Sequence, residues 1–166
     1  MASAIVAGPL CFVASTIGLL FLLSAEEPAL GVVMIASSLP ATLYLMVVNC
    51  VFLYKLWASI QDGRARTSPG AAVGFLFIPV YSVYWVFQAL WGFARDYNAF
   101  IARHSVEAPR LPEGVFLAYV ILSLVSGVPF LGFLASAAAF VLWLVIVSKA
   151  SDGVNALPRV GGIPSA

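Results

Sequence analysis

Charged side chains are what this sequence lacks most. Lysine, arginine, aspartate and glutamate make up 9% of its 166 residues, whereas 63% of the residues are hydrophobic. A soluble domain is about 25% charged and about 45–50% apolar, so these residues cannot cover a surface that faces water. The composition also excludes disorder, which needs low hydrophobicity and high net charge. An integral membrane protein is the class that remains.

Reactive side chains are equally few. The chain has one histidine, His104, and two cysteines, Cys11 and Cys50, which lie in apolar stretches where a free thiol packs as a small apolar group. No set of ligands has metal-site spacing, and no Ser-His-Asp or Cys-His arrangement can be assembled around His104. We therefore predict no catalytic residue, no cofactor and no metal. The net charge of +1 suggests no nucleic-acid partner.

Charge-free stretches divide the sequence into segments long enough for a helix of about 20 residues to span a membrane. We predict an all-α integral membrane protein with about four transmembrane helices, forming a single domain over residues 1–150. A flexible cytoplasmic tail is expected over residues 151–166. The apolar run from Ile5 to Leu23 is longer than the core of a signal peptide, so we expect it to be retained. The predicted apolar elements are residues 3–23, 29–57, 71–100 and 114–148.

Three prolines are predicted to break these helices. Pro40 lies inside the second element, where a kink is expected, Pro79 divides the third, and Pro129 closes a Gly127–Pro129 break in the fourth. A proline removes one helical hydrogen bond and clashes with the preceding turn. The helix before Pro79 would be only about 12 Å long, which is too short to cross a bilayer. Residues 71–100 are therefore predicted to form a re-entrant or interfacial element.

The lysines and arginines distinguish two topologies. If residues 71–94 and 114–148 each cross the membrane once, five cations lie on one side and three on the other. If both segments enter and return, all eight cations lie on one side, which the positive-inside rule favours. We favour the second topology. Either topology gives a multi-pass protein of the cell inner membrane with cytoplasmic N- and C-termini.

Polar and aromatic side chains follow Pro79 at helical spacing and form one stripe. Such a stripe is typical of a helix near lipid headgroups, and it is the candidate face for a partner protein or a lipid. A simple aromatic belt that only packs is the alternative. Asn49 and Gln88 are expected to hydrogen-bond between helices, and contact with a substrate is the alternative. The stripe consists of Tyr81, Tyr84, Trp85, Gln88, Trp91 and Arg95.

Residues 66–98, RTSPGAAVGFLFIPVYSVYWVFQALWGFARDYN, resemble a segment of small multi-helix bacterial membrane proteins of unknown function. Those proteins carry a Pro-Gly pair, a short apolar run with Ala-Val-Gly, then Phe-Ile-Pro and a helix rich in aromatic residues. Some of them follow an N-terminal GYF-like domain. The resemblance implies membrane helices and carries no activity and no catalytic residue.

These patterns favour a non-enzymatic function. We expect a small membrane scaffold or accessory subunit of a bacterial inner-membrane complex. Its partners would be the lipid bilayer and either other membrane subunits or further copies of itself. A small oligomeric channel or transporter, with its path lined by the broken helices, is the alternative. The charge-free stretches hold no aspartate, glutamate, lysine, arginine or histidine, which disfavours proton-coupled transport.

Overall fold

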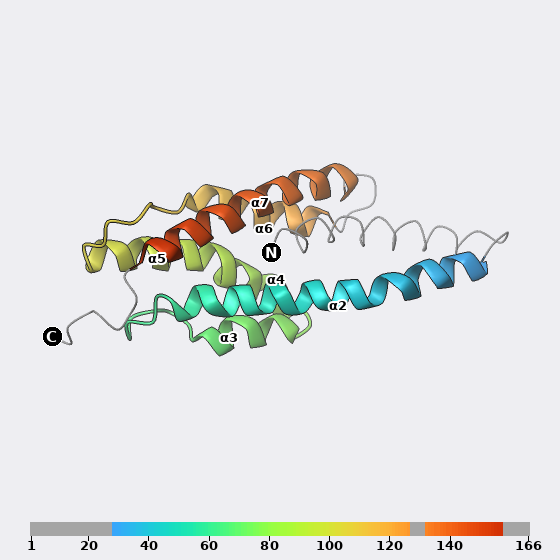
Figure 1. The fold of residues 1–166 in the computed structure, drawn as a ribbon, viewed down its shortest axis with the longest axis horizontal. Helices are drawn as coiled ribbons and strands as arrows, with labels where there is room; N and C mark the ends of the chain where they lie inside the picture. Colours follow the sequence, from blue (N-terminus) through green and yellow to red (C-terminus); the bar gives the residue numbers. More distant parts are fainter. Residues whose placement is uncertain (1–27, 127–131, 158–166) are drawn as a thin grey trace. The chain divides into compact units, whose positions relative to one another are not determined.

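The computed structural model describes residues 28–126 and 132–157. Within these ranges the chain is helical and contains no strand, as the composition predicts (Figure 1). Where the sequence suggested one domain over residues 1–150, the structure divides into two compact units after Val51, and each is described by itself. The predicted first span over residues 3–23 and the break at Pro129 lie outside the described residues.

The first unit contains most of α2, which runs from Pro28 to Ala58 and matches the predicted second element. The helix continues through Pro40, so this proline does not end it, and the kink expected there stays a prediction. A proline removes a single backbone hydrogen bond, and hydroxyl groups can bond to carbonyls of the affected turn. The hydroxyls of Ser38 and Thr42 donate to the carbonyls of Ile35 and Ser38 at 2.8 and 3.0 Å, around that proline.

Two helices in the described residues are long and apolar enough to cross a membrane. They are Ile35–Ala58 in α2 and Leu134–Ala156 in α7, which runs from Gly132 to Ala156. Only 11% and 22% of the most apolar 18-residue stretch of each helix is buried. An apolar helix in the core of a soluble protein is mostly buried. Their length, composition and exposure indicate association with a membrane. The described residues support two such helices and do not support four.

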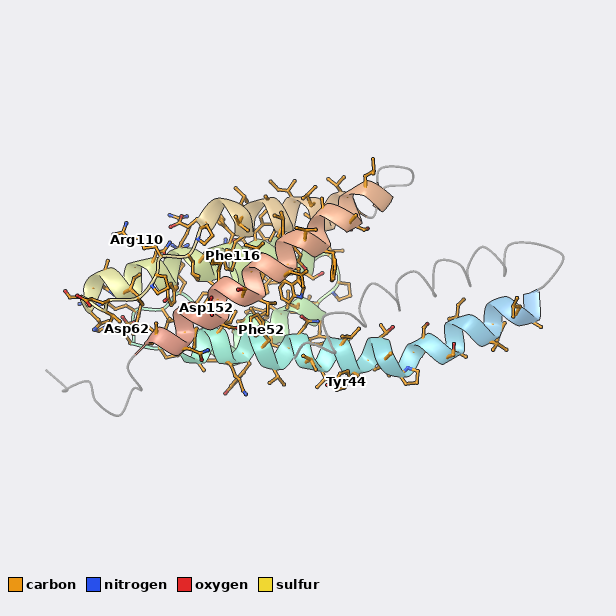
Figure 2. The ribbon with its side chains drawn as sticks, turned by 45° about the horizontal axis from the view of Figure 1, so that its top comes forward. Tyr44, Phe52, Asp62, Arg110, Phe116 and Asp152 are labelled. Atoms are coloured by element: carbon orange, nitrogen blue, oxygen red, sulfur yellow. The ribbon has the colours of Figure 1, made fainter. Side chains whose placement is uncertain are left out.

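Apolar side chains cover the exposed surface of α2 in the first unit. Tyr44, which is labelled in Figure 2, is one of them. Leucine, valine and methionine at such a surface match a lipid or protein environment better than water. The exposed large apolar residues are Leu30, Val32, Val33, Leu39, Leu43, Tyr44, Met46, Val47 and Val51.

After the end of α2 and a short loop, the second unit forms a helical hairpin that turns at Pro79, as the sequence predicts. The first arm consists of α3 (Pro69–Gly74) and the 3₁₀ turn η1 (Phe75–Phe77). The second arm consists of α4 (Tyr81–Val86) and the π-helical turn η2 (Phe87–Trp91). We call residues 69–91 the Pro79 hairpin.

The two arms of the Pro79 hairpin lie side by side. The indole Nε1 of Trp85 donates to the carbonyl of Ala72 at 3.1 Å. The ring of Phe75 packs edge-on against Trp85, with 4.8 Å between the ring centroids. The first arm begins at Ser68, whose hydroxyl accepts from the amide of Ala71 as an N-cap. The chain therefore reverses its direction within this segment.

A second hairpin follows the amphipathic helix α5 (Gly92–Arg103). It consists of α6 (Glu113–Val125) and α7, which lie side by side (Figure 1). The rings of Tyr119 and Trp143 meet between them, 5.3 Å apart at their centroids. With 13 residues, α6 is about 20 Å long, shorter than a hydrocarbon core of about 30 Å.

The core of the second unit lies where the end of α2 meets η2, α5, α6 and α7. The indole of Trp57 lies at its centre, and its Nε1 donates to the carbonyl of Ala89 at 3.0 Å. The ring of Trp57 packs against the ring of Phe93, with 5.7 Å between the centroids. Burial of such aromatic side chains supplies most of the packing energy in a small bundle. The largest fully buried side chains are Trp57, Tyr97, Phe93, Phe116, Ile60, Ile146 and Val120.

Candidate functional site

One end of the second unit holds a network of polar side chains, which we call the polar end. It comprises the loop of residues 59–68, the helix α5 and the linker of residues 104–112. In Figure 2, Asp62 and Arg110 lie toward this end, while Phe116 lies farther along the unit. The side chains at this end were separate features of the sequence, and the fold brings them together.

The first contact joins Arg66 and Asp96. The Nε of Arg66 lies 2.8 Å from Oδ1 of Asp96, and the amide of Arg66 donates to Oδ2 at 3.0 Å. Asp96 is only 7% exposed, and a carboxylate so buried needs a partner of this kind. Because Arg66 precedes the Pro79 hairpin and Asp96 follows it, this ion pair holds both ends of the hairpin together. We call it the Arg66–Asp96 clasp.

A second contact fixes the same loop to the end of α5. Oδ2 of Asp62 lies 2.7 Å from Nη2 of Arg103 and 3.2 Å from Nε2 of His104, while Oδ1 accepts from the amide of Arg64 at 2.9 Å. Burial raises the pKa of the Asp62 carboxyl. The hydrogen bonds from Arg103, the Arg64 amide and His104 outweigh burial and lower that pKa to about 2.

The pKa of Asp62 predicts a pH dependence of stability. Since the pKa lies below the ordinary value of 3.8, the carboxylate stabilises the fold above pH 3.8, and this contribution is lost as the pH falls to about 2. Asp62→Asn lacks that contribution, so its melting temperature should lie below that of the wild type at neutral pH. Thermal melts in detergent at pH 2 to 7 should show the difference closing below pH 4. The exposed Asp152→Asn should follow the wild-type curve; a constant difference for Asp62→Asn would contradict the assignment.

Asn98 ties the linker and the start of α6 to α5. Its Nδ2 donates to the carbonyl of Leu111 at 2.9 Å and to Oε1 of Glu113 at 3.0 Å. Its Oδ1 accepts from the amide of Leu111 at 2.8 Å. An amide side chain that uses donor and acceptor on the same loop fixes both the position and the direction of that loop. The start of α6 therefore lies at the polar end.

The end of α7 returns to the polar end as well. A Cβ placed on Gly153 would lie 2.7 Å from Oη of Tyr97 and 3.6 Å from Cδ2 of Leu111, so α7 approaches α5 closely at this glycine. Residues 151–156 form the last turns of α7, so the prediction that they belong to a flexible tail is wrong. Packing against α5 continues the helix beyond its apolar run, which local sequence does not reveal.

These contacts gather most of the cations at one end. Six of the described cations belong to these contacts or lie within about one helical turn of a residue that does. The seventh, Lys55, lies in the last turn of α2, just before the loop of residues 59–68. The eighth cation, Arg159, lies outside the described residues. The seven are Lys55, Arg64, Arg66, Arg95, Arg103, Arg110 and Lys149.

The predicted polar-aromatic stripe is only partly exposed. Tyr81 and Tyr84 are exposed, and Nε2 of Gln88 donates to Oη of Tyr84 at 3.1 Å. Trp85 is buried, because the first arm of the Pro79 hairpin packs on it. The guanidinium of Arg95 lies over the ring of Trp91, 5.0 Å from its centroid. The exposed face thus excludes Trp85.

The polar residues expected to join helices bond within their own helices. Nδ2 of Asn49 donates to the carbonyl of Leu45 at 2.8 Å, and Gln88 donates to Tyr84 one turn earlier. An interhelical role for either residue stays a prediction. Cys50 is a half-buried free thiol, while Cys11 lies outside the described residues. Among the described residues, no group of three or more histidines, cysteines or carboxylates could hold a metal ion.

Sequence reasoning missed the residues that build the polar end. Asp62, Asp96 and Asn98 each bond to a residue at least 13 positions away, so helical spacing gives no hint of these contacts. One indication was present. At helical spacing Asp96 shares a face of α5 with Phe93 and Phe100, and a carboxylate buried on such a face requires a cationic partner.

No protein-family model, curated protein or solved structure matches this sequence. The fold and the polar end nevertheless define a structural class. The described residues form an all-helical protein with two helices able to cross a membrane and a polar network at one end of the second unit. The resemblance of residues 66–98 to small bacterial membrane proteins stays a prediction.

Proposed function

We propose that this chain is a small non-enzymatic scaffold or accessory subunit of a bacterial inner-membrane complex. The pairing of its polar side chains carries the proposal. Asp62, Asp96 and Asn98 each hold a loop in place, so these groups serve to fix the shape of the polar end. Catalysis requires polar groups that are aimed at a substrate. A rigid polar end on apolar helices suits a subunit that positions partners.

The proposed topology has the second unit entering the membrane from one side. The Arg66–Asp96 clasp supports a Pro79 hairpin that enters and returns, and the approach of Gly153 to Tyr97 supports the same for α6 and α7. The cations of the polar end then face the cytoplasm, in agreement with the positive-inside rule. Both termini lie in the cytoplasm in this arrangement.

Purification of the full chain in mild detergent tests the proposed function. We expect one membrane protein to copurify at a fixed stoichiometry, measured by quantitative mass spectrometry. Asp96→Ala, which opens the clasp, should reduce that stoichiometry, whereas the exposed Asp152→Asn should leave it unchanged. A chain that purifies alone and conducts ions in liposomes would instead support the channel alternative and overturn the scaffold proposal.

A further inference from the structure

The tip of the Pro79 hairpin is apolar and exposed. Val80 is 87% exposed and has a φ of 66°, a conformation that β-branched residues rarely adopt. An apolar patch of this kind on a protein surface marks contact with a membrane or another apolar partner. The exposed large apolar residues of the hairpin are Phe75, Phe77, Ile78, Val80, Tyr81, Val83 and Tyr84.

The base of the hairpin is polar and closed. The Arg66–Asp96 clasp joins the residues just before and just after the hairpin, with 2.8 Å between Nε of Arg66 and Oδ1 of Asp96. This contact lies at the polar end. Because both ends of the hairpin are held together at one polar surface, the two ends cannot lie on opposite sides of a bilayer. The apolar tip can therefore reach into a membrane only from the side of the polar end.

The length of the second arm matches one leaflet. From Tyr81 to Trp91 the helix rises about 15 Å, which is half of a hydrocarbon core of about 30 Å. With Val80 near the bilayer midplane, Trp91 lies at the boundary between acyl chains and headgroups, where tryptophan is enriched. Arg95 lies one turn, about 6 Å, farther out and thus among the headgroups.

Arg95 is a free cation at this depth. Within the described residues it forms no ion pair, since the neighbouring carboxylate of Asp96 is taken by Arg66. The stacking of its guanidinium on Trp91, 5.0 Å from the ring centroid, holds it in place. A planar guanidinium bonds well to phosphate oxygens, and cations at this level attract anionic lipids.

We propose that the Pro79 hairpin inserts into a single leaflet and that Arg95, stacked on Trp91, binds the phosphate of an anionic phospholipid. The acyl chains of that leaflet cover the apolar tip. This proposal rests on the membrane location of the protein. It does not require a partner subunit, so the absence of a copurifying protein would leave it unaffected.

Cysteine labelling of the full chain in liposomes tests the insertion. In a Cys11→Ser, Cys50→Ser background, the variants Arg64→Cys and Arg110→Cys should react with a membrane-impermeant maleimide from the same side. A fluorophore on Val80→Cys should be quenched more by lipids with a nitroxide deep in the acyl chain than by lipids with one near the headgroup. Labelling of the two arginine positions from opposite sides, or quenching of the Val80 probe only near the headgroup, would overturn the proposal.

Lipid titration tests the role of Arg95. Native mass spectrometry of the detergent-solubilised chain with phosphatidylglycerol or phosphatidylcholine should show preferential binding of the anionic lipid. Arg95→Gln should lower that preference about fivefold, as expected for one cation at a membrane surface. Arg110→Gln is the control, because it also removes one positive charge, but from the linker. It should lower the preference for the anionic lipid by less than about twofold. Equal losses in both variants, or no loss in Arg95→Gln, would overturn the assignment of Arg95.

Discussion

Replacing Asp96 by alanine will lower the melting temperature of the protein in detergent by roughly 5–10 °C. The substitution leaves Arg66 and its amide without their shared acceptor. Breaking a buried ion pair costs about 3–5 kcal/mol. The Arg66 side chain is 48% exposed and regains water, so about 2–3 kcal/mol is expected here. For a chain of this size each kcal/mol shifts the melting temperature by about 2–4 °C.

Two further variants isolate the clasp. Asp152→Asn removes an exposed carboxylate from α7 and should change the melting temperature by less than about 2 °C. Arg66→Ala combined with Asp96→Ala should cost less than the sum of the two single variants, because the second change removes a group that has already lost its partner. Additive losses would show that Asp96 acts through burial alone and would contradict the clasp.

Replacing Gly153 by alanine will destabilise the second unit by about 1–3 kcal/mol, the usual cost of an overpacked core. The new Cβ would lie 2.7 Å from Oη of Tyr97 and 3.0 Å from its Cζ. Tyr97 is fully buried, so its ring has no room to retreat without moving α5 or α7. Chemical denaturation followed by tryptophan fluorescence would measure the loss.

Tyr97→Phe should reverse much of this effect. The buried Tyr97 hydroxyl has no hydrogen-bond partner among the described residues, so its removal breaks no contact and is expected to stabilise the fold by about 1 kcal/mol. Combined with Gly153→Ala, it should restore most of the lost stability. Gly114→Ala is the control, since open space surrounds that glycine and alanine favours a helix by about 0.5–1 kcal/mol. Wild-type stability of Gly153→Ala would refute the close approach.

Local features of the sequence predicted the elements that depend on local chemistry. The charge-free stretch before Lys55 gave a helix with nearly the bounds of α2, and Pro79 marked the turn of the hairpin. A proline cannot donate the backbone hydrogen bond of a helix interior, so a break at Pro79 could be expected from the sequence alone. Pro40 did not follow the same rule, because the long apolar helix around it outweighs one missing hydrogen bond.

Contacts between distant residues could not be predicted in this way. Trp85 has the spacing of an exposed stripe, yet the first arm of the hairpin buries it. The π-helical turn η2 also shifts the helical register after Phe87, and uniform spacing of 3.6 residues does not anticipate it. The cationic partners of Asp62 and Asp96 lie 30 or more positions away, and they follow only from the fold.

The gathering of charges at the polar end bears on how the protein is made. In the proposed topology, none of the seven described cations has to be translocated, and a charged side chain at the centre of a bilayer costs about 2.5–3.5 kcal/mol. The second unit could thus enter the membrane as preformed hairpins after synthesis, without dependence on the transmembrane potential. Among the described helices, α2 is the one that would require the insertion machinery to pass a chain segment to the far side.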